Sequence, residues 1–593
     1  MTLELGTAPP PTAEEGRAIL AERNAQVEKV VLQAFRTALP EAASSGVALL
    51  AVGGYGRREL FPFSDIDLMI LTQDEKSIPA KEAISSFLQS LWDAGLRPIH
   101  SVHTVADCAK EHDGNTELTI SLLDRRFLAG SEAVYGAADT AFQQFTKRRG
   151  DAIRRQLASL AMGRRSKYQY TIYHLEPNIK ETPGALRDLQ TTRWLLALHP
   201  QEGYPSLDAA FDFFTGLRIR LHETSGRDHN TLDYASQDML SAEPEALMRQ
   251  YYRYARVVDR AVRQALETAT EQPAGILGQF NEWRSRLSTA DFTVSRGRVL
   301  LRNSTPPENL SPYEFVARHE LRLAPSAVER LSQVSPKTDW EAWKRLLSLP
   351  KAAVGVRAMQ ETGALTKCLP GWDHIECLVV RDFYHRYTVD EHTLVALTAL
   401  ESASDGRFQD LWAETDQKHL VRFALLMHDI GKATGEDHSI AAVKISNRIL
   451  ADLGAPESDR ATIEFLIDQH LILSSVMTGR DLYDESTAVM LGENIGTVER
   501  LKLLAMLTLA DISAVNPQAM TPWRLEQLWR VYTMAYSELT KGLDSARIHE
   551  DNRHQCGSNG DKREPVDAVD RGRLAHADGV RPDVTRKVPR QAG

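Results

Sequence analysis

The sequence GGYGRRELFPFSDIDLMIL, residues 53–71, decides how the N-terminal part of the chain is interpreted. It follows an apolar run, GVALLAV, which is typical of a buried strand that ends at glycine. Gly53 and Gly54 leave backbone amides unencumbered before a helical turn, where phosphate oxygens are favoured. Asp65 and Asp67 then open a second strand, and its two-residue period turns both carboxylates to the same face. Two carboxylates on one face can hold Mg²⁺.

This order of residues indicates phosphoryl or nucleotidyl transfer. Such a reaction needs a divalent metal that bridges carboxylates and a triphosphate, while the protein positions the groups and neutralises charge. The glycines would hold the phosphates and the aspartates would hold the metal. Alternatively, the glycines form an ordinary turn and the aspartates lie on a solvated strand edge. If only one of these two motifs were present, this alternative would be the better interpretation. The two pieces together, in this order, favour the catalytic interpretation.

Length and composition limit the class of protein. A chain of 593 residues is too long for one hydrophobic core, so we expect roughly three or four domains. No apolar run is long enough to cross a bilayer, and the first residues lack the pattern of a signal peptide. We therefore expect a cytoplasmic protein that binds no membrane. The net charge of -10 gives no global reason to expect nucleic-acid binding. The four cysteines form no CxxC pair, so any metal should be held by histidine and carboxylates.

Hydrophobic periodicity predicts a multidomain α+β protein. A helix, a strand, a second strand, a helix and a third strand are expected at 13–38, 46–54, 64–72, 78–95 and 98–105. The chain then becomes helical, with a small strand pair expected near 292–303, and the final residues lack aromatic side chains and periodicity. We expect a mixed α/β domain with an N-terminal helix at 1–150, a helical domain at 151–330, an all-α domain at 331–545 and a disordered tail at 546–593.

A second constellation lies in the C-terminal helical part. ALLMHDIGK is an apolar helix that ends at His428 and Asp429, while His392 and Asp511 each interrupt another apolar helix. Polar residues that face inward from three helices suggest one metal site, since buried imidazole and carboxylate groups need partners. Two imidazoles and two carboxylates suit manganese, magnesium, iron or zinc, which can supply hydroxide to attack a phosphodiester. Taken singly, each histidine is more often a hydrogen-bonded core or surface residue.

Several of these motifs resemble known families. The first stretch is similar to the signature of polymerase-beta-type nucleotidyltransferases, and its GGYGRxEL and PxSDIDL form resembles the bacterial PII uridylyltransferases. HSVHT (100–104), LEPNIKETPGALRDLQTTRW (175–194) and YTVDEHT (387–393) follow in the order of that family. HDIGK resembles the HD phosphohydrolases. The resemblance implies that 1–150 is a nucleotidyltransferase domain, that 151–330 is a helical domain associated with it and that 331–545 is an HD phosphohydrolase domain. The resemblance implies an enzyme that transfers UMP from UTP to a tyrosine of the PII nitrogen-signalling protein and hydrolytically removes it again.

The resemblance also implies roles for particular residues. Mg²⁺ is expected at the transferase site, and Mn²⁺, Mg²⁺ or another divalent metal at the HD site. His438, His470 and Lys432 lie where many HD enzymes hold a second metal or phosphate, although a core histidine and a solvated lysine are the alternatives. The expected catalytic residues are Asp65, Asp67, His428 and Asp429; the nucleotide-binding residues are Gly53, Gly54, Arg57, Ser64, Lys180 and Arg187; and the metal ligands are Asp65, Asp67, His392, His428, Asp429 and Asp511.

The chain departs from the family pattern at several positions. Arg97 stands where an acidic residue is often found, Asn178 replaces a common Asp, and PGALRD replaces PGGLRD. No third carboxylate of the transferase site is located. Two alternatives therefore stay open: the enzyme acts on another protein or a small molecule, or the first domain binds nucleotide without turnover. The family continues into two glutamine-sensing ACT domains; we expect this chain to lack them and direct glutamine control to be absent or altered.

Overall fold

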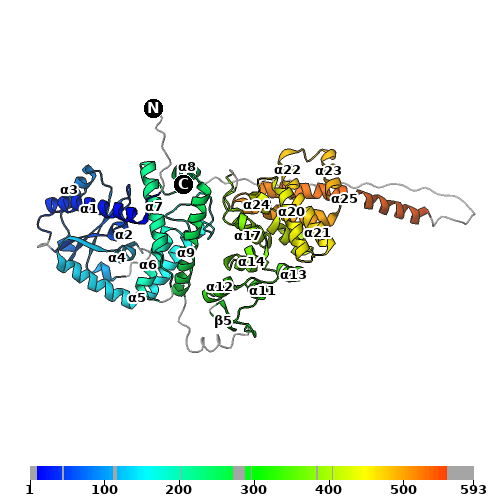
Figure 1. The fold of residues 1–593 in the computed structure, drawn as a ribbon. Coiled ribbons are helices and arrows are strands. Elements are labelled where there is room, and N and C mark those ends of the chain that lie inside the picture. Colours follow the sequence, from blue (N-terminus) through cyan, green and yellow to red (C-terminus); the bar gives the residue numbers. More distant parts are fainter. Residues whose placement is uncertain are drawn as a thin grey trace, which may run out of the picture.

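The computed structural model describes residues 10–556, apart from 43–45, 111–116, 202–203, 271–286, 296, 382–384 and 404; from residue 542 onward only the backbone is described. Helices dominate, and the described strands form two small sheets (Figure 1). The expected multidomain α+β class is confirmed. The part of the chain that the structure describes contains no helix both long and apolar enough to span a bilayer.

A four-stranded sheet carries the first motif. Its strands are β1 (Val47–Ala51), β2 (Ile66–Thr72), β3 (Pro98–Thr104) and β4 (Arg126–Gly130), in the spatial order β3-β2-β1-β4. β1 is antiparallel to β2 and β4, whereas β2 is parallel to β3 and connects to it through α3 (Lys81–Asp93). The expected strands and the helix between them are confirmed. The glycines after β1 form a single helical turn, α2 (Gly53–Gly56).

Both faces of this sheet are covered. Leu49 and Leu68 pack with α1 (Ala13–Ala38) and α3, whereas Leu50 and Met69 pack with α5 (Glu132–Lys167). Successive strand residues point to opposite faces, which explains why these strands are nearly continuous apolar runs. α5 is one unbroken helix through residue 150, where we expected a domain boundary, so the sheet and the helical part share this helix.

The helical part that follows packs around α5 and α9 (Pro244–Thr270). Its centre holds a buried ion-pair network: Arg165 bonds both Asp188 and Asp259, and Arg164 also bonds Asp188. The helical part also contains α6 (Leu186–Leu198), α7 (Asp208–Ser225) and α8 (Tyr234–Leu240), whereas η1 (Glu75–Ser77), η2 (Asp107–Ala109) and α4 (Glu117–Leu123) lie between the strands of the first sheet.

The second half of the chain has its own extended hydrophobic core, from Phe292 to Ala535. A small sheet, β5 (Phe292–Ser295), β6 (Arg298–Leu301) and β7 (Arg322–Leu323), confirms the expected strand pair and adds a short parallel strand. The central helices are α17 (Val389–Glu401), α19 (Lys418–Met427), α20 (His438–Asp452) and α24 (Val498–Val515).

The remaining helices surround this core. They are α11 (Ser311–His319), α12 (Pro325–Ser332), α13 (Trp340–Ser348), α14 (Ala352–Glu361), α15 (Ala364–Cys368), α16 (Trp372–Ile375), α18 (Gly406–Ala413), η3 (Ile430–Ala433), α21 (Glu457–Asp468), α22 (Ile472–Gly479), α23 (Glu485–Ile495) and α25 (Pro522–Cys556). The backbone of α25 is helical beyond residue 546, where we expected the tail to begin, and residues 557–593 lie outside the described residues.

The two halves meet through backbone as well as side-chain contacts. The amide of Leu175 donates to the carbonyl of Arg386 at 2.9 Å, and Arg256 pairs with Glu376 at 2.8 Å. In Figure 1 the first sheet lies at one end of the molecule and the helices around α20 lie at the other. The two motif regions are therefore separate sites on one chain.

Candidate functional site

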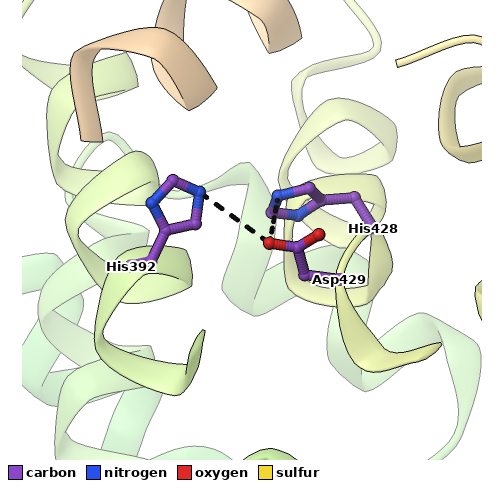
Figure 2. Close-up of side chains that lie close together, drawn as sticks. All are labelled: His392, His428 and Asp429. Atoms are coloured by element: carbon purple, nitrogen blue, oxygen red, sulfur yellow. Dashed lines mark ion pairs between the residues drawn. The ribbon is translucent and has the colours of Figure 1, made fainter. Parts of the chain in front are cut away.

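Four side chains of the second constellation converge in the helical core, and Figure 2 shows three of them, His392, His428 and Asp429. His392 Nε2 lies 2.8 Å from Asp511 Oδ1 and 4.0 Å from Asp429 Oδ2. His428 Nε2 lies 3.3 Å from Asp429 Oδ2 and 3.6 Å from Asp511 Oδ1. His392, His428 and Asp429 are all almost completely buried. The structure thus brings together residues from α17, the end of α19 and α24 that are distant in sequence.

Local structure fixes the orientation of these side chains. His392 lies in the first turn of α17, and His428 is the residue at which α19 ends. His428 Nδ1 lies 2.7 Å from the carbonyl oxygen of Leu425, which assigns the proton to Nδ1 and leaves Nε2 facing the carboxylates. An imidazole held in this way through its other nitrogen is the usual arrangement of a metal ligand.

The cluster suits a cation. Ligand atoms of His392, His428 and Asp429 lie within 4.8 Å of one another, and the buried Nε2 of His428 makes no hydrogen bond to any described residue. Burial by itself would lower the pKa of His428, but the charges of Asp429 and Asp511 outweigh it and raise the pKa to about 10. Nitrogen and carboxylate donors around a pocket that stabilises positive charge fit a divalent metal ion.

A second group shares Asp429 with the first. Ligand atoms of Asp429, His438 and His470 also lie within 4.8 Å of one another. His470 Nδ1 lies 2.7 Å from the carbonyl oxygen of Ile467, and the ring centroids of His470 and His438 are 5.6 Å apart. His470 is thus both a buried, hydrogen-bonded histidine and a member of the cluster. Asp429 lies at the junction of the two groups.

Lys432 also contacts this junction. Its Nζ lies 2.7 Å from Asp429 Oδ2, and its side chain is only 17% exposed. Lys432 and the charge of His428 both lower the pKa of Asp429, against the effect of burial. The solvated-lysine alternative is therefore wrong, because Lys432 belongs to the cluster.

Sequence reasoning missed two neighbours of this centre. The ring centroid of His385 lies 5.1 Å from that of His392. Glu391, directly before His392, is buried and pairs with Arg357 at 3.0 Å. The signal was available in the polar sequence HRYTVDEHT (385–393), but nothing in its spacing showed that His385 would turn back toward the helix.

In the first constellation the glycines are required by close contacts. Gly53 has a φ of +56°, and a Cβ atom there would lie 2.6 Å from Asp67 Oδ2. A Cβ on Gly56 would lie 1.9 Å from the carbonyl oxygen of Asp124. Gly54 has less crowded surroundings, with its nearest atom at 3.3 Å. The GGYG turn therefore lies directly against the aspartate-bearing strand, as the sequence predicts.

The two aspartates differ in their surroundings. Burial is the main cause that raises the pKa of Asp67, the charge of Asp65 adds to it, and Lys180, Arg57 and Arg187 oppose it. Asp65 is more exposed and pairs with Arg97, whose Nε lies 3.0 Å from Asp65 Oδ1. Arg97 stands where the family often has an acidic residue, and in the structure its positive charge compensates that of Asp65.

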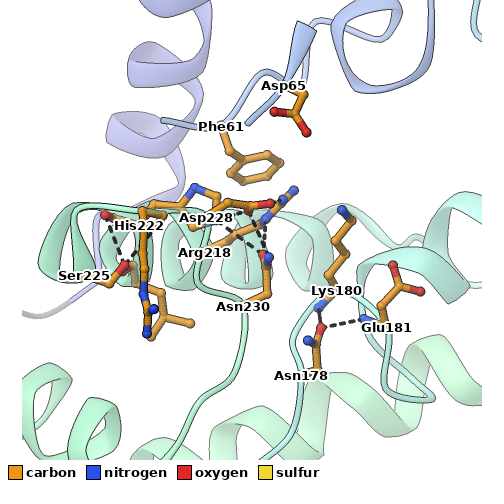
Figure 3. A network of polar contacts seen from close by, with 12 residues as sticks. Phe61, Asp65, Asn178, Lys180, Glu181, Arg218, His222, Ser225, Asp228 and Asn230 are labelled. Carbon is orange, nitrogen blue, oxygen red and sulfur yellow. Dashed lines mark hydrogen bonds and ion pairs between the residues drawn. The ribbon is translucent and has the colours of Figure 1, made fainter. Parts of the chain in front are cut away.

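Basic groups from the helical part face the aspartates. In Figure 3, Asp65 comes from the sheet region on one side, and Lys180 and Glu181 come from the loop between α5 and α6 on the other. Asn178 shapes this loop, because its Oδ1 accepts hydrogen bonds from the amides of Lys180 and Glu181 at 3.0 and 2.9 Å. Arg187 bonds Gln190 and is half-buried. Lys180 and Arg187 therefore lie close enough for their charges to lower the pKa of Asp67.

Arg57 and Ser64 have different positions. Arg57 pairs with Glu59 at 2.7 Å and with Asp124, to which Trp194 also donates a hydrogen bond. Its guanidinium therefore ties the glycine turn to the rest of the domain. Ser64 is half-buried at the entrance to β2, and its backbone amide bonds the carbonyl of Phe61. The sequence pattern alone could not show whether Arg57 makes structural contacts or binds the nucleotide.

Comparisons with known proteins lead to the family that the motifs resemble. Residues 151–201 match the family described as GlnD PII-uridylyltransferase. A bifunctional uridylyltransferase/uridylyl-removing enzyme of Bordetella parapertussis is 31% identical over 560 residues, which cover 85% of this chain and 64% of that protein. Proteins of the same name from Ruegeria pomeroyi and Azospirillum brasilense are each 29% identical, over 84% of this chain and 60% and 59% of their own lengths.

The chain thus spans less than two thirds of the length of these curated relatives. The aligned part covers most of this chain, and the relatives' printed names combine a uridylyltransferase with a uridylyl-removing enzyme. Over 85% of its length the chain is therefore similar to bifunctional uridylyltransferase/uridylyl-removing enzymes, which confirms the resemblance inferred from its motifs.

Proposed function

We propose that this chain is a bifunctional enzyme that transfers UMP from UTP to a tyrosine of a PII signalling protein and hydrolyses the resulting phosphodiester. The observation that carries the proposal is the convergence of His392, His428, Asp429 and Asp511 in a chain that also places paired aspartates against a glycine turn. The relatives' names combine these same two activities. The sheet would carry the transferase, and the second helical core would carry the hydrolase.

In the proposed transfer, the tyrosine hydroxyl loses its proton to solvent, and its oxygen bonds to the α-phosphorus of UTP as the bond to pyrophosphate breaks. Amides of the Gly53–Gly54 turn, with Lys180 and Arg187, would bind the phosphates and stabilise the negative charge of the leaving pyrophosphate. Asp65 and Asp67 would hold Mg²⁺, which supplies charge neutralisation when bound. For this, Asp65 would have to exchange its contact with Arg97 for the ion.

In the proposed removal, a water oxygen bonds to phosphorus and the tyrosine oxygen leaves with a proton. His392, His428, Asp429 and Asp511 would hold a divalent ion, which lowers the pKa of bound water. His438 and His470 would hold a second ion or the substrate phosphate together with Asp429. Lys432, beside Asp429, would stabilise the negative phosphate oxygens of the substrate.

A labelling experiment tests both activities. The purified chain is incubated with Mg²⁺, PII and UTP labelled in the α-phosphate, and removal is measured on PII-UMP prepared separately. Asp65→Ala should abolish labelling and leave removal intact, whereas His428→Ala should do the reverse. Loss of both activities in either folded variant would contradict the assignment of two separate sites. A parent chain with neither activity would defeat the proposed function.

A second candidate function is favoured by one contact. Because Arg97 pairs with Asp65, the first domain would bind nucleotide without transferring it. Unchanged UTP affinity in an Asp65→Ala, Asp67→Ala double variant, together with a parent that removes UMP but does not add it, would favour this candidate. Metal-dependent UTP binding and transfer by the parent would exclude it.

A further inference from the structure

A cavity of about 350 Å³ lies between the two halves of the chain, apart from both motif regions. It is lined by α9 on one side and by β6, β7 and α14 on the other, and the loop after α5 closes one end. A larger crevice of about 720 Å³ adjoins it and shares Tyr170, Thr171, Arg263, Arg322 and Arg357 with it. Even without the adjoining crevice, the volume of the cavity lies within the range that a small-molecule ligand requires.

The cavity wall is strongly basic. Six arginines line it, against three carboxylates, although the whole chain carries a net charge of -10. Several of these arginines are already paired: Arg263 with Asp259 and Glu361, and Arg357 with Glu391. Arg256 and Arg298 are paired as well, with Glu376 and Glu267. The arginines beyond these four leave a small excess of positive charge in a confined space, which favours an anionic ligand.

Two of the arginines are available to such a ligand. Arg260 is exposed and makes no hydrogen bond or ion pair with any residue that the structure describes. Arg322 is 68% exposed, and its nearest carboxylate, Glu267, lies 3.8 Å away and also pairs with Arg298. Arginine presents a planar fork of donors that matches the geometry of phosphate. These two side chains could therefore bind phosphate without breaking a buried contact.

An aromatic ring lies at the mouth of the same space. Tyr170 lines both the cavity and the adjoining crevice, and it is 49% exposed. Tyr170 and the preceding Gln169 both have left-handed backbone conformations, with φ of 59° and 51°. Non-glycine residues adopt this conformation at some energetic expense, so the loop holds the Tyr170 ring in this position against a local preference. An exposed ring beside free arginines suits a planar base attached to phosphate.

We propose that this cavity binds a nucleoside phosphate, with Arg260 and Arg322 on the phosphate and Tyr170 against the base. The site is separate from the two catalytic centres proposed above. It also has a physical connection to one of them, because Arg357 in its wall pairs with Glu391, which directly precedes His392. Binding requires neither metal nor PII, so it can be tested independently of both catalytic activities.

Calorimetric titration of the full chain with ADP, in the presence of EDTA, tests the phosphate contacts. The parent should bind ADP, and the double variant Arg260→Gln, Arg322→Gln should bind at least about tenfold more weakly, because two charge-assisted contacts are removed. Arg253→Gln, Arg318→Gln is the matched control, since both arginines are exposed and neither lines the cavity. Equal affinity in the parent and the cavity variant, or no binding by the parent, would overturn the proposal.

Two further comparisons test the contact with the base. Tyr170→Phe should bind ADP as the parent does, whereas Tyr170→Ala should lose several-fold in affinity because the stacking surface is removed. Inorganic pyrophosphate should bind more weakly than ADP. Pyrophosphate binding as tight as that of ADP, or equal affinities in the two Tyr170 variants, would overturn the assignment to a nucleoside phosphate. Unchanged circular dichroism spectra check that each variant is folded.

Discussion

Replacement of Asp188 by alanine is expected to destabilise the N-terminal half of the chain. Asp188 is completely buried, bonds Arg164 and Arg165, and accepts a hydrogen bond from the amide of Gly184 at 2.8 Å. After the substitution, Arg165 stays buried with Asp259 as its remaining carboxylate partner. Asp259 also pairs with Arg263, so it compensates Arg165 only in part, and the loss of a carboxylate from a buried ion pair destabilises a protein by about 3–5 kcal/mol.

The same change should affect the transferase site. Asp188 holds Gly184, in the loop that carries Lys180, and directly follows Arg187. Loosening this loop should move both cations away from Asp67 and weaken UTP binding. Removal of UMP should be unaffected, because the second constellation lies in the other half of the molecule (Figure 1).

Differential scanning calorimetry measures the effect on stability. For a cooperative unit of 150–250 residues, a loss of about 3–5 kcal/mol lowers the transition temperature by about 6–20 °C. Asp151→Ala is the matched control on α5, because Asp151 is 67% exposed and its pair with Arg154 should contribute little. If Asp188→Ala changes the transition no more than Asp151→Ala does, the reasoning from buried charge is refuted.

Three further substitutions test the two sites separately. Gly56→Ala should abolish UMP transfer and spare removal, because the new Cβ would lie 1.9 Å from the carbonyl oxygen of Asp124; full transfer activity would contradict the packing. Gly431→Ala should abolish removal and spare transfer, since its Cβ would lie 2.2 Å from the carbonyl oxygen of His438, the first residue of α20. Each variant serves as the control for the other in the labelling assay. Arg97→Ala should raise the Mg²⁺ affinity of the transferase site by less than about fivefold, because its pair with Asp65 is largely exposed. Mg²⁺ titration of UTP binding measures this change, and a lower affinity would show that Arg97 assists the site.

Much of the local structure could be predicted from the sequence. The apolar runs at β1 and β2, the helix between β2 and β3, and the first helix all follow from hydrophobic period and glycine positions. The domain division was harder, since α5 runs through the expected boundary at residue 150. Periodicity identifies a helix but does not show which of two cores its faces cover.

The candidate sites, too, could be predicted only in part from the sequence. The order of HD and flanking residues predicted that His392, His428, Asp429 and Asp511 belong together, and the tertiary structure brings them within reach of one another. The sequence did not predict which cations compensate the carboxylates: Lys432 contacts Asp429, and Arg97 pairs with Asp65.

The sequence by itself determined which types of side chain occur at both sites, because the motifs place glycine, aspartate and histidine at fixed spacing along a strand or helix. Only the tertiary structure decided that Arg97 pairs with Asp65, that Arg57 is bound between Glu59 and Asp124, and that arginines gather in a cavity between the two halves. Apart from the pair of Arg57 with Glu59, these contacts join residues that are distant along the chain. Their energies depend on burial and distance, which arise only when separate elements pack together.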